Sequence, residues 1–202
     1  MKRAVLLGCL VLFFVPIAWA QEKCEAPVWK TGDKWTFKRA DSITYTNQVV
    51  DVKNDLFIVK VGGDTDLYGY DRETVNLKFM IKEDGRQMKA TNDLRKLFNF
   101  PIFVGKKWTD TNSRRSDSLK QQQESTFLIE FNVEGTEDLT TPAGTFKTYK
   151  IRHKLTNSRW NKSGWILFWY SPDVKWWVKR EVEKSSFWGN LLNAELISYE
   201  LK

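Results

Sequence analysis

Apolar and polar positions alternate with a period of two through most of the chain beyond residue 20. Lys34–Lys38 alternates charged residues with aromatic rings, and Thr126–Val133 carries Phe, Ile, Phe and Val at every second position. This period is typical of strands with one buried face. Strands are therefore predicted at Lys34–Lys38, Ile43–Lys53, Leu56–Val61, Leu67–Asp71, Val75–Lys82, Thr126–Val133, Thr145–Leu155, Trp165–Tyr170, Lys175–Glu183 and Ala194–Leu201.

Turn signals separate these strands at short intervals. Asn54-Asp55, Glu83-Asp84-Gly85 and Ser171-Pro172-Asp173 are sequences that favour tight turns between antiparallel strands. The polar stretch from Asn112 to Glu124 is interpreted as a solvated loop or the tip of a long hairpin. The pattern predicts an all-β meander of short antiparallel strands.

At most one short helix is expected, over Asn92–Asn99. Asp93 can cap its start, Leu94, Leu97 and Phe98 share one face, and Pro101 ends it.

The pattern G-x-K-W-T occurs twice, at Gly32–Thr36 and at Gly105–Thr109. Each copy follows a turn and opens a run of predicted strands. A duplicated β-unit accounts for this, with two similar halves at residues 28–100 and 101–202, and a coincidence of five residues is the alternative.

The N-terminus has the pattern of an export signal. Lys2 and Arg3 precede an apolar run from Ala4 to Ile17, and Ala18-Trp19-Ala20 supplies a small-x-small cleavage site. We expect residues 1–20 to be a cleaved signal peptide, residues 21–202 to form one domain, and the protein to be periplasmic or secreted. An uncleaved anchor and a lipid anchor at Cys9 are the alternatives.

The charge limits the class of partner, and the cysteine content indicates how the fold is stabilised. The net charge is +7, and the basic residues occur as scattered pairs among acidic ones. This indicates a solvated surface or a face for anionic lipid or glycan head groups at a membrane surface, and nucleic acid is not expected for an exported protein. Cleavage leaves Cys24 as the sole cysteine, so the core must supply the stability that disulfides give other exported domains.

Residues with catalytic or metal-binding chemistry are scarce. His153 is the only histidine, and it is expected to face solvent or to pair across the sheet. Metal sites commonly need several His or Cys ligands, so no metal, cofactor or catalytic residue is predicted. A Cys24–His153 dyad is conceivable without local support. Asp64 and Asp66 lack the spacing of a calcium loop.

Aromatic content is the most unusual feature. In Trp165–Tyr170 both strand faces are apolar, and Trp176 and Trp177 are expected on opposite faces of the next strand. A strand with one solvent-exposed face should alternate apolar and polar side chains. These rings therefore pack in the core, contact a ligand or lipid, or mediate self-association. The predicted ligand-binding residues are Trp160, Trp165, Trp169, Tyr170, Trp176 and Trp177.

Four segments together resemble the DUF3108-like family of bacterial exported proteins: G-D-K-W-T-F at Gly32, F-P-I-F-V-G-K-K-W at Phe100, T-P-A-G-T-F-K-T-Y-K-I at Thr141 and W-Y-S-P-D-V-K-W-W-V-K-R-E at Trp169. The family pattern often has glycine where this chain has Trp176. Such proteins are similar to the open barrels of the lipoprotein carriers LolA and LolB. The resemblance implies a curved antiparallel sheet or open half-barrel with a carrier or binding role, and it brings no catalytic residues.

The leading hypothesis is a non-enzymatic envelope protein that binds an apolar or lipid-like ligand in a groove of the curved sheet. The alternative is a structural or interaction module that docks another envelope protein through its sheet edges or through Arg114 and Arg115. A third hypothesis is a hydrolase that acts on cell-wall or glycan material through acidic residues.

Overall fold

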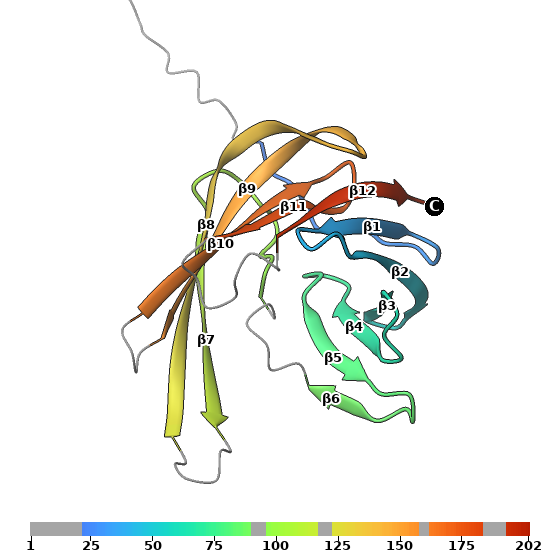
Figure 1. The fold of residues 1–202 in the computed structure, drawn as a ribbon, viewed down its shortest axis with the longest axis horizontal. Helices are drawn as coiled ribbons and strands as arrows, with labels where there is room; N and C mark the ends of the chain where they lie inside the picture. Colours follow the sequence, from blue (N-terminus) through green and yellow to red (C-terminus); the bar gives the residue numbers. More distant parts are fainter. Residues whose placement is uncertain (1–21, 90–95, 117–122, 158–161, 184–192) are drawn as a thin grey trace, which may run out of the picture.

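The computed structural model describes residues 22–89, 96–116, 123–157, 162–183 and 193–202. These residues form one antiparallel sheet of twelve strands in the order β6-β5-β4-β3-β2-β1-β12-β11-β10-β9-β8-β7 (Figure 1). The strands are β1 (Lys34–Arg39), β2 (Thr44–Lys53), β3 (Leu56–Val61), β4 (Leu67–Asp71), β5 (Leu77–Ile81), β6 (Gln87–Lys89), β7 (Lys107–Ser116), β8 (Gln123–Thr141), β9 (Gly144–Asn157), β10 (Lys162–Ser171), β11 (Trp176–Val182) and β12 (Ala194–Glu200).

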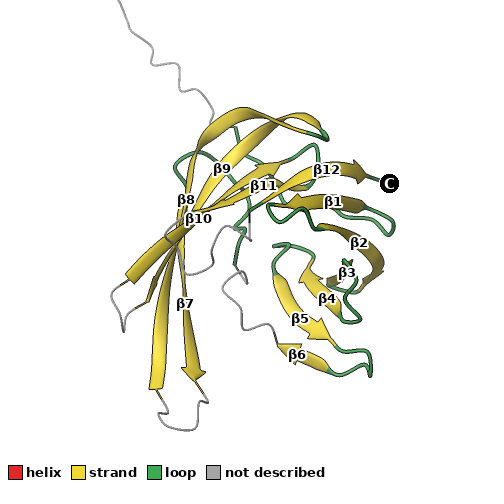
Figure 2. Cartoon of the chain, viewed as in Figure 1, coloured by secondary structure: helices red, strands yellow, loops and turns green. Residues whose placement is uncertain are grey.

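The sheet curves strongly and stays open, with β6 and β7 at its two edges (Figure 1). This confirms the predicted all-β class and the curved, open antiparallel sheet. The described residues contain no helix (Figure 2). Within this part of the chain there is accordingly no helix long and apolar enough to cross a membrane. Residues 92–95 of the predicted helix lie outside the described part, and residues 96–99 are not helical.

The sequence pattern predicted β8 too short and missed β7. β8 continues through the polar residues after Val133 as far as Thr141, and a shift in register between Val133 and Gly135 accommodates this polar stretch within its pairing with β9. β7 reaches Ser116 and β8 begins at Gln123, so the described residues of the predicted polar stretch, 112–116 and 123–124, belong to the paired strands of a hairpin and not to a solvated loop.

The two G-x-K-W-T copies have the same backbone geometry. Gly32 has a φ of 99° and its N–H donates to Val49 O at 2.8 Å, while Gly105 has a φ of 83° and donates to Val133 O at 2.8 Å. Both glycines adopt the left-handed region that other residues avoid, directly before β1 and β7. The first half of the chain contributes β1–β6 and the second half β7–β12, and a shared origin of the halves stays a prediction.

The inner face of the curve is filled by two segments without regular structure, residues 22–33 and 96–106. They pair with each other through Cys24 and Ile102, whose backbone groups exchange hydrogen bonds of 2.8 and 2.7 Å. Trp29 lies 4.8 Å from Trp176, 5.1 Å from Trp35 and 5.1 Å from Phe57, measured between ring centroids. The core is therefore a cluster of aromatic rings that joins both halves of the sheet.

Candidate functional site: an aromatic hollow on the inner face

Trp169 lies on the outer face of the sheet, away from the aromatic core. Lys150 Nζ of β9 and Lys179 Nζ of β11 lie 5.4 and 5.0 Å from its ring centroid, and its Nε1 donates to Glu137. Lysine stems can bury a ring while their ammonium groups stay in water, and Trp169 is only 4% exposed. The ring is covered by the protein's own basic side chains.

Trp165 has a similar cover. Arg152 Cζ lies 5.3 Å from its ring centroid, and Arg152 also pairs with Glu134. These charged neighbours explain why β10 is apolar on both faces. The alternation rule fails here because Lys and Arg of adjacent strands, rather than solvent or a partner, contact the outer rings.

Tyr170 lies on the inner face and is buried. Its ring centroid is 5.1 Å from Phe98 and 5.6 Å from Phe100. Its hydroxyl is buried without a hydrogen-bond partner among the described residues, and burial raises the pKa of the Cys24 thiol to about 11. Tyr170 thus packs the segment 96–106 against β10.

Trp176 and Trp177 line one cavity together, so the prediction that they point to opposite faces is wrong. The pairing of β10 with β11 shifts in register between Trp169 and Tyr170: Trp169 pairs with Lys179 and Tyr170 with Trp177, which leaves Val178 as an extra residue. This bulge re-aims side chains at Val178, whereas Trp176 and Trp177 pair in register with Ser171 and Tyr170. Trp160 lies outside the described residues.

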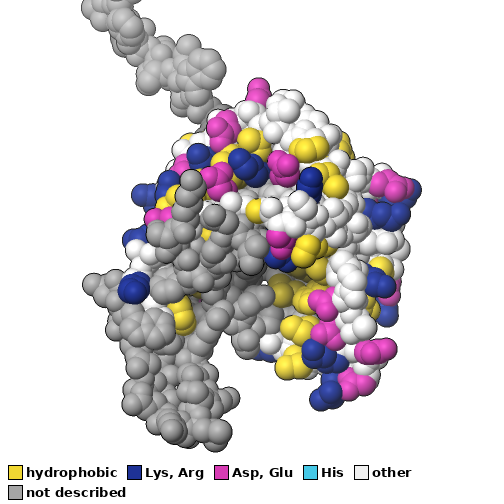
Figure 3. All heavy atoms as spheres, in the orientation of Figure 1, with side chains coloured by type: hydrophobic (Ala, Val, Ile, Leu, Met, Phe, Trp, Pro, Cys, Tyr) yellow, Lys and Arg dark blue, Asp and Glu magenta, His cyan; other side chains and the backbone are white. Residues whose placement is uncertain are grey.

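This cavity, which we call the aromatic hollow, has a volume of about 230 Å³. Rings from β2, β4, β10 and β11 form most of its wall: Tyr45, Tyr68, Tyr70, Phe168, Trp176 and Trp177. Aliphatic side chains complete the wall at Val61, Val75, Leu77 and Leu97. In Figure 3 hydrophobic side chains gather around a hollow on the inner side of the curve.

Besides the tyrosines, three lining residues of the hollow carry polar groups: Asn47, Trp176 and Arg180. Trp176 Nε1 and Asn47 Oδ1 are buried and have no hydrogen-bond partner within the described part of the chain. Arg180 lines the hollow, with its Cζ 5.3 Å from the Trp177 ring centroid. Burial lowers the pKa of Arg180, Tyr45 opposes this and Arg39 adds to it. The wall thus carries one partly desolvated cation, whereas the Trp176 Nε1 and Asn47 Oδ1 atoms are themselves inaccessible.

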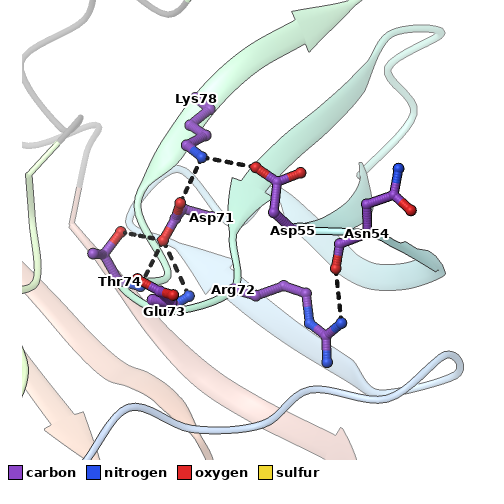
Figure 4. A network of polar contacts seen from close by, with 7 residues as sticks. All are labelled: Asn54, Asp55, Asp71, Arg72, Glu73, Thr74 and Lys78. Carbon is purple, nitrogen blue, oxygen red and sulfur yellow. Dashed lines mark hydrogen bonds and ion pairs between the residues drawn. The ribbon is translucent and has the colours of Figure 1, made fainter.

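One wall of the hollow depends on the turn between β4 and β5. Asp71 Oδ1 accepts hydrogen bonds from Glu73 N at 3.0 Å, Thr74 N at 2.8 Å and Thr74 Oγ1 at 2.9 Å (Figure 4). Val75 follows with a φ of 56°, a conformation that is strained for a β-branched residue. The turn holds the buried Val75 side chain in the wall.

Lys78 ties this turn to the one between β2 and β3. Its Nζ lies 2.7 Å from Asp71 Oδ2 and 3.0 Å from Asp55 Oδ2 (Figure 4). Burial raises the pKa of the Asp71 carboxyl, but Lys78 and Thr74 lower it overall, and Lys78 lowers that of Asp55. Glycoside hydrolysis needs one carboxyl with a raised pKa. Because the pKa values of Asp55 and Asp71 are both lowered, this pair is suited to holding the two turns together.

His153 is fully buried between Phe131 and Phe168, with ring centroids at 4.8 and 6.4 Å. It pairs across the sheet as expected and does not face solvent. Burial lowers the pKa of His153 to about 4, while that of Cys24 is raised to about 11. Both shifts oppose the thiolate–imidazolium pair of a nucleophilic dyad. Among the described residues no cluster of His, Cys, Asp or Glu is suited to a metal ion.

The sequence prediction missed the side of the hollow built by β2–β5. Tyr68 and Tyr70 alternate around Gly69, which is a detectable period-two signal, and Tyr45 and Asn47 show the same spacing. Which rings would face each other across the curve depended on the pairing of β1 with β12, which no local pattern encodes.

Comparisons with known proteins bear on the fold and the family. Structurally similar proteins include the hypothetical lipoprotein YmcC of Escherichia coli K12, at 13% identity over 87% of this chain and 89% of that one with a TM-score of 0.49. A putative lipoprotein of Parabacteroides distasonis has 17% identity over 89% and 100%, with a TM-score of 0.44. A putative exported protein of Bacteroides fragilis with a YmcC-like fold has 15% identity over 88% and 99%, with a TM-score of 0.40.

No curated protein matches the sequence. The model of the family described as DUF3108-like matches residues 71–186, more than half of the chain. The matched region includes three of the four segments on which the resemblance was based. The chain therefore belongs to the DUF3108-like family.

Proposed function

We propose that this protein is a non-enzymatic, exported envelope protein that binds an apolar or lipid-like ligand in the aromatic hollow. The observation that carries the proposal is the hollow itself, walled by six aromatic and four aliphatic side chains on the inner face of an open sheet. Binding pockets are typically concave, mostly apolar and supplied with a few polar groups. Trp176 and Trp177 are the predicted binding residues that line it.

The volume limits the ligand. About 230 Å³ exceeds the ~150 Å³ cavity that holds benzene and is below the ~300–1,000 Å³ of sites for drug-sized molecules. One hydrocarbon chain or one ring suits this space, and two acyl chains do not. Each buried methylene contributes roughly 0.8 kcal/mol, so a single chain end can provide measurable affinity.

The export part of the proposal rests on the N-terminal pattern. Cleavage after Ala20 would release the chain into the periplasm or the exterior, where lipid-derived amphiphiles are at hand. The mass of the protein recovered from a bacterial host's periplasm tests this, and a mass that retains residues 1–20 would contradict it.

Native mass spectrometry of the purified exported protein tests ligand binding. We expect a bound small apolar molecule, or uptake of decanol when the protein is offered it. Leu77→Trp fills the hollow and should abolish this signal. Ile81→Trp makes the same change further along β5, outside the lining residues, and should preserve it.

Equal binding by Leu77→Trp and Ile81→Trp would place the ligand elsewhere. A protein that takes up no apolar molecule, and instead purifies with a stoichiometric envelope protein, would favour the docking-module alternative over the binding function.

A further inference from the structure

Three tyrosines bring hydroxyl groups to the aromatic hollow. Tyr45 of β2 and both Tyr68 and Tyr70 of β4 line it. The Tyr68 hydroxyl donates to Asp64 Oδ2 at 2.6 Å. Within the described residues the hydroxyls of Tyr45 and Tyr70 have no hydrogen-bond partner, and neither is among the polar atoms that are closed off from solvent. Two unpartnered hydroxyls are therefore accessible in a mostly apolar hollow.

The three hydroxyls lie close enough together to affect one another. Burial raises the pKa of Tyr70, and the Tyr68 and Tyr45 hydroxyls raise it further. Burial also raises the pKa of Tyr45. Both phenols therefore stay protonated and uncharged near neutral pH, where each hydroxyl can donate one hydrogen bond and also accept. A buried tyrosine hydroxyl usually has a partner, so this pair favours a ligand that supplies one.

The charged groups around the hollow do not favour an ion of either sign. Burial, the hydrogen bond to Asp64 and the charges of Asp64 and Asp66 raise the pKa of Tyr68 to about 12, so these carboxylates lie on the Tyr68 side. At the β11 wall the Arg180 guanidinium lies over Trp177, with its Cζ 5.3 Å from the ring centroid. An ion that enters between these opposite charges loses its hydration without gaining a dedicated partner. An uncharged polar group avoids most of this cost.

Resting on the proposed function, we propose that the ligand is an uncharged amphiphile whose hydroxyl or carbonyl oxygen hydrogen-bonds with the hydroxyls of Tyr45 and Tyr70, while its hydrocarbon part packs against the other rings. A carbonyl oxygen has two lone pairs and can accept from both hydroxyls, and an alcohol can accept from one and donate to the other. The two tyrosines thus select for an oxygen atom without selecting for charge.

Calorimetric titration of the purified protein with five probes tests the head group. Decanol and 2-decanone carry an uncharged oxygen, decanoate and decyltrimethylammonium carry a charge on a chain of similar length, and butylbenzene carries no oxygen. Decanol and 2-decanone should bind about tenfold or more tightly than either ion. The tighter of these two probes identifies the preferred group as a hydroxyl or a carbonyl.

Tyr70→Phe and Tyr45→Phe each delete one hydroxyl and keep the ring. Each should weaken binding of decanol and 2-decanone about three- to tenfold, the value of one hydrogen bond, and should change the affinity for butylbenzene less than about twofold. Tyr199→Phe is the matched control, because Tyr199 is 40% exposed on β12 and lies outside the lining residues, and it should change neither affinity. The deleted hydroxyls have no partner within the described residues, so each variant should unfold at the same urea concentration as the parent protein, which separates lost binding from lost folding.

An ion that binds as tightly as decanol, or equal effects of Tyr70→Phe and Tyr199→Phe on decanol, would overturn the head-group assignment and leave the binding function intact. A folded protein that binds none of the five probes would overturn both.

Discussion

The single histidine of the chain shows how burial alters one residue's chemistry. His153 is fully buried between two phenylalanine rings, and burial disfavours its charged form. Its pKa is therefore about 4 in the folded protein against an ordinary value of 6.5. Below about pH 6.5 the unfolded chain takes up a proton that the folded chain refuses.

The contribution of His153 to the free energy of unfolding should therefore be fully present above about pH 6.5. It should fall by on the order of 3 kcal/mol as the pH drops toward about 4. Urea unfolding at about pH 7.5 and about pH 4.5 measures the loss. His153→Phe keeps a stacking ring and removes the titration, so its stability should fall by roughly 2 kcal/mol less between these two conditions.

Carboxylates also titrate in this range, and they do so in both proteins. The difference between the two pH dependences therefore isolates His153. Identical dependences would show that the imidazole reaches water in the folded state.

At the scale of elements, the turn between β4 and β5 combines a polar network with a strained residue. Three hydrogen bonds to Asp71 Oδ1 fix the turn. The turn then holds Val75, at a φ of 56°, in the wall of the hollow. The strain is sustained because these contacts over-determine the backbone.

Asp71→Ala should therefore lower the free energy of unfolding by about 1–3 kcal/mol, as measured with urea, and should also weaken ligand binding by loosening the wall. Asp84→Ala is the matched control. Asp84 Oδ1 likewise accepts a turn N–H, from Arg86 at 3.0 Å, but its side chain is 54% exposed. Its removal should cost less than about 0.5 kcal/mol, and equal costs for both variants would contradict the role given to the turn.

The elements that the sequence predicts well are bounded by clear turn signals. The strand at Leu56–Val61, an apolar run between two turns, was placed with its observed bounds, and the turns at Asn54-Asp55 and Ser171-Pro172-Asp173 lie where expected. That Trp176 and Trp177 line one cavity was not predictable, because strict alternation along a strand places consecutive residues on opposite faces. The sequence also could not show that the Trp169 ring is covered by Lys150 and Lys179, because these lysines lie on neighbouring strands and contact the ring only once the strands have paired.

At the scale of the whole molecule, a segment without strand structure closes the inner face of the sheet. Trp29 donates from Nε1 to Lys175 O at 3.0 Å and contacts rings from both halves of the sheet. The strand pattern could not reveal this, because residues 22–33 carry no periodicity and acquire their role only where the sheet curves around them.

Trp29→Ala should lower the free energy of unfolding by about 3–5 kcal/mol, the usual cost of deleting a large buried ring. Trp108→Ala deletes a half-buried tryptophan that stacks on Phe131 at 4.9 Å and should cost less than half as much. Urea unfolding of the two variants compares them. Equal losses would mean that residues 22–33 contribute little to the closure of the core.

The direct test of the hollow as a binding site follows the indole N–H groups by nuclear magnetic resonance while decanol is added to the ¹⁵N-labelled protein. The Trp176 Nε1–H signal should shift and saturate, because the Trp176 side chain lines the hollow. The Trp169 signal should stay in place, because its donor is held by Glu137 on the outer face. Shifts at Trp169 without one at Trp176, or no saturable shift at either, would contradict ligand binding between the two halves of the sheet.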